Sequence, residues 1–171
     1  MGDFDLKVLY NALDAQRQAR RLTWAGAMRE ITGQTERRIP RSVATSTIRT
    51  LANKPVAEAD GVLSMLRWLN RAPESFVHGH PQFGAAGFTH PPLRAHQCLR
   101  FHAQTIYARL DDERQCRGLT WKQVAGELGW FFSASGLTRL KNGGRVGFPH
   151  IMRIAAWLNR PAADLMRASD W

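Results

Sequence analysis

Apolar residues near the start of the chain recur at the helical period. Leu6, Leu9 and Leu13 stand three and four positions apart, with polar residues between them. This spacing predicts a first helix that ends near residues 21–22. Thr23 then has the side chain of an N-cap residue, which predicts a second, shorter helix. The apolar positions of that second helix are Ala27, Met28 and Ile31.

Three further helices are expected before residue 78. Residues 32–41 are polar and basic and contain Gly33 and Pro40, so they are interpreted as an extended loop. Residues 42–52 and 59–70 have helical patterns, and Asn70 suits a left-handed C-terminal cap. Pro73 predicts a short fifth helix that ends near residues 76–77. The inward positions of the third and fourth helices are Val43, Ile48, Leu51, Val62, Met65, Leu66 and Leu69.

The same pattern then returns later in the chain. Residues 10–30 and 107–127 share Tyr, Leu, Asp, Arg-Gln, Arg, Leu-Thr-Trp and Glu in the same order and spacing, and residues 67–71 are answered by 156–160. An internal repeat indicates the domain architecture directly, independently of helix and strand propensities. Two copies predict a duplicated domain: a first domain over residues 1–78, a linker over 79–97 and a second domain over 98–171. The expected fold class is all-α, with two tandem five-helix domains.

The second copy is expected to repeat the five helices. Thr120 and Gln123 form a capping-box pattern at the second helix, and Gly129 suits the turn after it. Residues 133–140 predict the third helix. Pro149 predicts the start of the fourth, and residues 164–166 the last. The apolar positions of the first and third helices are Phe101, Ile106, Tyr107, Leu110, Leu137 and Leu140.

The segment between the copies is rich in Gly, Pro and His. It is interpreted as a linker in which Phe83, Phe88 and Leu93 dock against a domain. Four histidines lie in or beside it, with Cys98 close by, but they lack the paired short spacings of a structural zinc site. Solvated histidines are the favoured interpretation, and neither a metal nor a cofactor is expected. The histidines are His78, His80, His90 and His96.

Charge is the informative feature of the composition. The 171 residues include 24 Lys+Arg and 14 Asp+Glu, a net charge of +10, which favours a polyanionic partner, nucleic acid first and an acidic membrane surface second. No apolar run approaches the ~18 residues that a membrane span requires. The acidic start of the chain is unlike a signal peptide, so a cytoplasmic, nucleoid-associated protein is expected. Cys98 and Cys116 are expected to be free thiols, with Cys116 a small buried packing residue.

Each copy resembles the helix-turn-helix domain of phage Cro and repressor proteins, the Xre-like family. In the first copy the resemblance is carried by Leu22-Thr23, by Val43, Thr47-Ile48, Leu51 and Asn53, and by the apolar fourth helix ending at Leu69-Asn70. In the second copy Val124-Ala125 and Asn142-Gly143 match the family more closely. The first copy has about eight to ten extra residues before its third helix. The resemblance implies five short helices and DNA binding through the third.

The resemblance also implies site residues. Arg139 is the strongest candidate, because arginine reads guanine O6 and N7 in a bidentate way. Helix ends and flanking loops are expected to contact phosphates. Four tryptophans recur in pairs and are assigned to packing: Trp24, Trp68, Trp121 and Trp157. The base-reading candidates are Thr45, Ser46, Thr50, Ala134, Ser135 and Arg139. The phosphate-binding candidates are Thr23, Arg37, Arg38, Arg41, Lys54, Thr120, Lys141, Asn142 and Arg145.

These features predict a sequence-specific regulator of transcription that binds double-stranded DNA, with repression the expected sign. One chain would act as a monomeric pseudo-dimer on an asymmetric site, in preference to a homodimer. No catalytic residues are expected, because carboxylates occur singly or in the run 111–113 and no nucleophile or phosphate-loop motif is present. Two alternatives stay open: an antitoxin-like or adaptor protein with one copy bound to a protein partner, and an RNA-binding protein.

Overall fold

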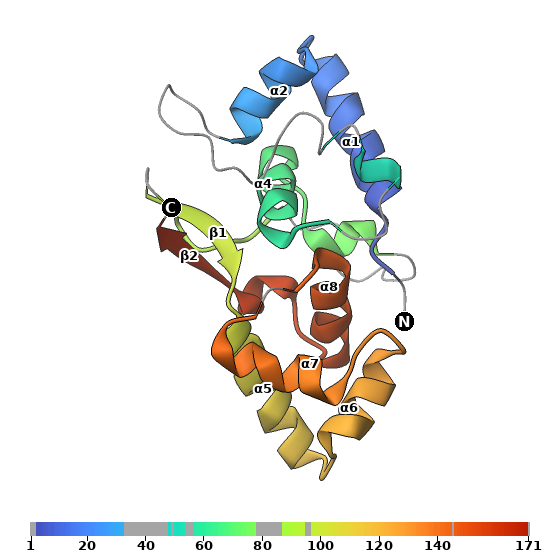
Figure 1. The fold of residues 1–171 in the computed structure, drawn as a ribbon. Coiled ribbons are helices and arrows are strands. Elements are labelled where there is room, and N and C mark those ends of the chain that lie inside the picture. The colour runs from blue at the N-terminus through green and yellow to red at the C-terminus, as the bar shows by residue number, and fades with distance from the viewer. Residues whose placement is uncertain are drawn as a thin grey trace.

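The computed structural model describes residues 3–32, 48, 50–53, 57–77, 87–94, 97–144 and 146–170. Over these residues the chain is mainly helical (Figure 1). The α-helices are α1 (Leu6–Ala19), α2 (Trp24–Ile31), α4 (Ala59–Leu69), α5 (Ala103–Cys116), α6 (Trp121–Leu128), α7 (Ala134–Arg139) and α8 (Phe148–Trp157). Short 3-10 turns occur at Leu51–Asn53, Pro73–Phe76, Leu140–Asn142 and Ala162–Leu165. The strands are β1 (Gln97–Phe101) and β2 (Met166–Asp170).

The prediction of an all-α fold with two tandem five-helix domains is wrong. β1 and β2 pair antiparallel, from Gln97 opposite Asp170 to Phe101 opposite Met166. The sequence pattern divides residues 97–101 between the linker and a helix, and it predicts the last helix at residues 164–166, where the strand β2 in fact begins at Met166. The final helix of each copy is reduced to one 3-10 turn, after which the chain runs extended beside the segment that enters the copy. Backbone groups of such segments are satisfied by pairing with each other, which a helical reading of either segment does not reveal.

The first copy contains the same pairing in its shortest form. Phe4 and Val77 form an isolated antiparallel bridge, and they occupy the positions that Phe101 and Met166 occupy in the second copy. Beside each pair, a backbone N–H donates to a carbonyl of the 3-10 turn. Asp5 donates to Phe76 at 2.9 Å in the first copy, and His102 donates to Leu165 at 3.1 Å in the second. The second copy therefore lengthens into a two-stranded sheet what the first copy makes as a bridge.

Most of the helix ends are where the sequence places them. Thr23 caps α2 by accepting a hydrogen bond from Gly26 N at 3.1 Å. Thr120 and Gln123 form the expected capping box at α6. Asn70 has a φ of 51°, the left-handed cap predicted for α4. These confirmed ends show that capping chemistry positions the helices locally.

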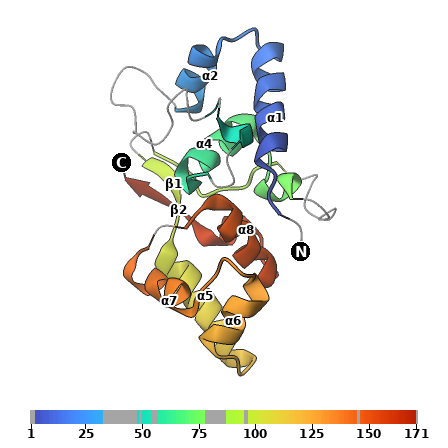
Figure 2. The ribbon, with the colours of Figure 1, turned by 45° about the vertical axis from the view of Figure 1, so that its right-hand side comes forward.

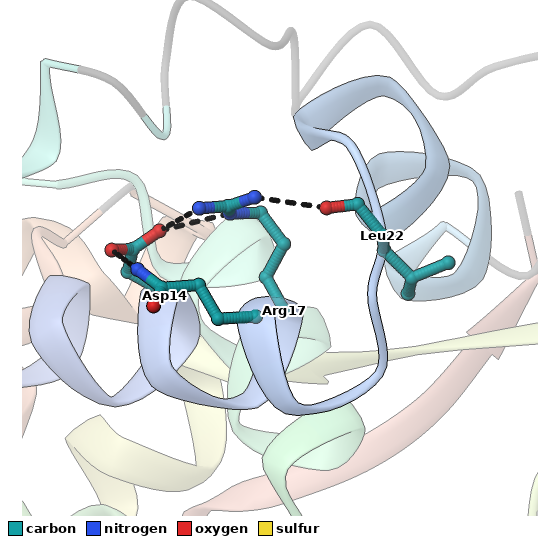
Figure 3. A network of polar contacts seen from close by, with 4 residues as sticks. Asp14, Arg17 and Leu22 are labelled. Atoms are coloured by element: carbon teal, nitrogen blue, oxygen red, sulfur yellow. Dashed lines mark hydrogen bonds and ion pairs between the residues drawn. The ribbon is translucent and has the colours of Figure 1, made fainter.

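The repeated sequence phrase builds a repeated set of contacts. In the first copy Arg17 donates from Nε to Asp14 at 2.8 Å and from Nη1 to the Leu22 carbonyl at 2.9 Å, which ties α1 to the approach to α2 (Figure 3). In the second copy Arg114 makes the same two contacts, with Asp111 and the Leu119 carbonyl, at 2.8 and 2.9 Å. The shared residues therefore serve the scaffold of each copy.

The paired tryptophans are part of this scaffold, as predicted. The Trp68 indole N–H donates to Glu30 at 2.9 Å, and the Trp157 N–H donates to Glu127 at 2.8 Å. Trp24 and Trp121 stack on Tyr10 and Tyr107, the tyrosines that open the repeated phrase. Each copy thus fastens its fourth helix and its first helix to the second by equivalent aromatic contacts.

One hydrophobic core extends through both copies. Phe148, fully buried at the start of α8, has its ring 4.6 Å from that of Phe4 in the other copy. Its backbone N–H donates to the Ala57 carbonyl at 3.1 Å. Glu58 and Gly147 form an antiparallel bridge, and they precede α4 and α8 at equivalent positions, as expected for halves related by an approximate two-fold axis. In Figure 2, α1 and α2 accordingly lie on one side of this junction and α5, α6 and α7 on the other.

Three smaller expectations have mixed outcomes. Phe88 is buried and Leu93 packs partly against the core, as expected for a docked linker, whereas Phe83 lies outside the described residues. Cys116 is exposed, so its assignment as a buried packing residue is wrong, because its position faces away from the Ile106 and Leu110 stripe of α5. Among the helices of the described part, none is long and apolar enough to cross a membrane.

Candidate nucleic-acid interface

The second copy contains a compact helix-turn-helix unit formed by α6 and α7. Gly129 ends α6 with a φ of 124°, a conformation that side chains rarely adopt. The Phe132 N–H donates to the Gly129 carbonyl at 3.0 Å and closes the turn. A Cβ at position 129 would lie 2.9 Å from Nη1 of Arg153 on α8. The backbone conformation therefore favours glycine here, and a larger residue would also displace the tip of the Arg153 side chain.

α7 buries a narrow stripe and leaves the rest of its surface open. Leu137 is buried within the helix, and Leu140 is buried in the 3-10 turn that follows, as the sequence predicts. Ser135 and Arg139 are exposed, and their spacing of four residues places them on one face. Ala134, the third base-reading candidate of this copy, is half-buried beside them. The structure thus brings the three candidates together on one short helix.

Arg139 is the one long cationic side chain within α7 itself. Its side chain is exposed and makes no hydrogen bond or ion pair with the described residues. The Ser133 hydroxyl accepts from Gly136 N at 3.0 Å and fixes the start of the helix on which Arg139 is carried. The guanidinium therefore has its five donors available to an external acceptor.

The other base-reading and phosphate-binding candidates are exposed, act as N-caps, or lie outside the described residues. Lys141 and Asn142 are exposed directly after α7. The hydroxyls of Thr23 and Thr120 act as N-caps. Each accepts a hydrogen bond from its own helix, and this interaction competes with a phosphate contact. Thr50, a base-reading candidate of the first copy, is exposed, and Ile48 and Leu51 near it are buried as predicted. The remaining candidates lie outside the described residues: Thr45, Ser46, Arg37, Arg38, Arg41, Lys54 and Arg145.

Sequence reasoning assigned no role to an aromatic cluster in the α6–α7 turn. Trp130 is 92% exposed, and its ring centroid lies 5.3 Å from that of Phe131. Phe131 stacks on His150 of α8 at 5.0 Å, and Phe132 contacts the same imidazole at 5.4 Å. Burial, with a smaller effect from Arg153, lowers the pKa of His150 below its ordinary value. Three consecutive aromatics after a glycine were the available sequence signal.

The carboxylate of Glu127 on α6 is held by the scaffold. The hydrogen bond from Trp157 lowers the pKa of Glu127, desolvation opposes this, and the hydrogen bond and charge of Arg117 lower it further. Arg117 donates to both carboxylate oxygens, at 3.0 and 2.8 Å. Glu127 is therefore ionised at neutral pH and paired within its own copy.

Comparisons with known proteins return no match: no family model, curated protein or solved structure matches the chain. Within the described residues, no group of three or more His, Cys, Asp or Glu side chains is placed to hold a metal ion. The features of the chain that bear on function are therefore α6, α7 and the junction between the copies.

Proposed function

We propose that the protein is a sequence-specific regulator of transcription that binds double-stranded DNA through α7. The observation that carries this proposal is the open face of α7, where Ser135 and Arg139 project from a helix anchored by Leu137 and Leu140. A recognition helix in the major groove requires an exposed face with short or flexible polar groups on a fixed support. The net charge of +10 favours a polyanionic partner.

The contacts between the copies support action as an intramolecular pseudo-dimer. Phe148 and Phe4 share one core, and the bridge between Glu58 and Gly147 joins equivalent positions. A two-fold arrangement of DNA-binding units suits two half-sites on one face of a duplex. Because the candidate base-reading residues differ between the copies, the half-sites would differ and the whole site would be asymmetric. We propose repression, since occupation of a promoter suffices for it, and action on the nucleoid.

A selection from a randomised duplex library tests the proposal. The wild-type chain should enrich one sequence, and Arg139→Ala should lose the preference for one G·C pair, at a cost of about 1–3 kcal/mol on the selected site. Arg67→Ala is a charge-matched control, because Arg67 is an exposed arginine on α4 in the other copy. This control should select the wild-type sequence. Enrichment of no sequence by the wild-type chain, or tighter binding to structured RNA at matched salt, would contradict the proposal.

A further inference from the structure

The α6–α7 turn has a rigid backbone and carries one exposed side chain, that of Trp130. The hydrogen bond from Phe132 N to Gly129 O makes Trp130 and Phe131 the two central residues of a tight turn. Phe131 turns back toward α8, where it stacks on His150 at 5.0 Å. Trp130 turns outward and is 92% exposed. A large aromatic in that position gains little from folding of its own chain.

Contacts with residues distant in the sequence stabilise the α6–α7 turn. The Arg153 guanidinium lies over the Phe131 ring, 4.7 Å from its centroid. Arg153 in turn donates from Nε to Asp3 at 2.8 Å and from Nη1 to the Leu128 carbonyl at 3.2 Å. The turn is therefore held by α6, α8 and the segment before α1 together. An exposed indole on such a support loses little conformational entropy when it binds a partner.

The chemistry of the indole defines the surface that it fits. Its faces are apolar, and the described residues offer its N–H no hydrogen-bond partner. Tryptophan favours surfaces that combine an apolar body with an acceptor at its edge. The backbone of duplex DNA has this combination, because each deoxyribose ring adjoins phosphate oxygens.

The position of Trp130 relative to α7 agrees with that surface. Ala134, at the start of α7, is four positions after Trp130, a span of at most about 14 Å along the chain. The major groove is about 12 Å wide, so a residue this far from a base-reading helix is within reach of the phosphodiester strand at the groove edge. The net charge of +10 favours DNA as the partner over a protein surface with few acidic residues.

We propose that Trp130 is a backbone contact of the DNA complex, packing its ring on a deoxyribose and donating its indole N–H to the adjacent phosphate. The proposal rests on the function proposed above. In this arrangement the turn contributes affinity for any DNA sequence, and α7 recognises the bases. An uncharged contact also strengthens binding without adding to the release of counterions.

Salt titrations on the selected duplex and on an unrelated duplex test this assignment. Trp130→Ala should weaken binding about tenfold on both duplexes, as loss of one aromatic contact does, with an unchanged dependence of log K on log salt. Trp130→Phe should retain part of the affinity, because the ring remains and the N–H is lost. Lys141→Ala is the contrasting variant, and it should lower the salt slope by about 1. Melting curves should show that both Trp130 variants fold, because the side chain is exposed.

Two outcomes overturn the proposal. The first is wild-type affinity for Trp130→Ala on both duplexes, whether or not the substitution dissociates a self-associated wild type in sedimentation velocity. The second is a loss of affinity on the selected duplex alone, which would make Trp130 a base reader. If the wild-type chain binds DNA and Trp130→Ala binds equally, only this inference fails; if the wild-type chain selects no duplex, the proposed function fails first.

Discussion

Truncation of Phe148 tests the claim that the two copies share one core. Phe148 is fully buried, and its ring contacts Phe4 at 4.6 Å and Phe101 at 5.6 Å. Phe→Ala changes in cores cost about 3–5 kcal/mol, and contacts with two aromatic rings place this one near the middle of that range or above, at about 4 kcal/mol. In a chain of this size 1 kcal/mol shifts Tm by about 2–4 °C, so Phe148→Ala should lower Tm by about 8–16 °C.

Differential scanning calorimetry and urea unfolding followed by circular dichroism measure this effect. If the core is shared, one cooperative transition should move as a whole, because the copies lose their common packing together. Trp130→Ala serves as the control, since removal of a side chain that is 92% exposed should change stability by less than about 0.5 kcal/mol. Two separate transitions, with the first copy melting at its wild-type temperature in Phe148→Ala, would refute the reasoning.

Two further predictions concern the α6–α7 turn. Gly129→Ala should destabilise by about 1–3 kcal/mol in urea unfolding, because φ is 124° and the new Cβ would lie 2.9 Å from Arg153, whereas Gly126→Ala, with open space at its Cβ, should stabilise by about 0.5–1 kcal/mol; equal effects would contradict the assigned turn geometry. Burial lowers the pKa of His150, so between pH 6.5 and the lowered pKa the unfolded chain binds a proton that the folded chain does not. The free energy of unfolding should therefore decrease as the pH falls through this range. Urea midpoints at pH 8 and pH 5 should therefore differ less in His150→Gln than in the wild type, and an unchanged difference would contradict the burial of the imidazole.

Local chemistry made much of the helical part of the fold predictable. Thr120 and Gln123 specify a capping box whose geometry depends only on neighbouring residues, and Asn70 specifies a left-handed cap in the same way. Leu137 and Leu140 follow from the helical period. The internal duplication relates the Thr23 cap to the Thr120 cap, and Asn70 to Asn159, which has a φ of 50°.

The strands were missed because their pairing is non-local. Gln97 and Asp170 lie 73 positions apart, and neither segment has the clear alternation that marks a half-buried strand. The exposure of Trp130 was not predicted for another reason. Its sequence context showed three adjacent aromatics, but which of them turns outward depends on the positions of His150 and Arg153 on α8.

The stoichiometry of the DNA complex tests the central claim most directly. Sedimentation velocity on the selected duplex measures the number of bound chains, and the selected sequence shows whether its two halves match. We predict one chain on one asymmetric site, because the candidate base-reading residues differ between the two copies. Two chains on a strict palindrome would contradict the single-chain account, and a chain that binds every duplex alike would contradict sequence-specific recognition itself.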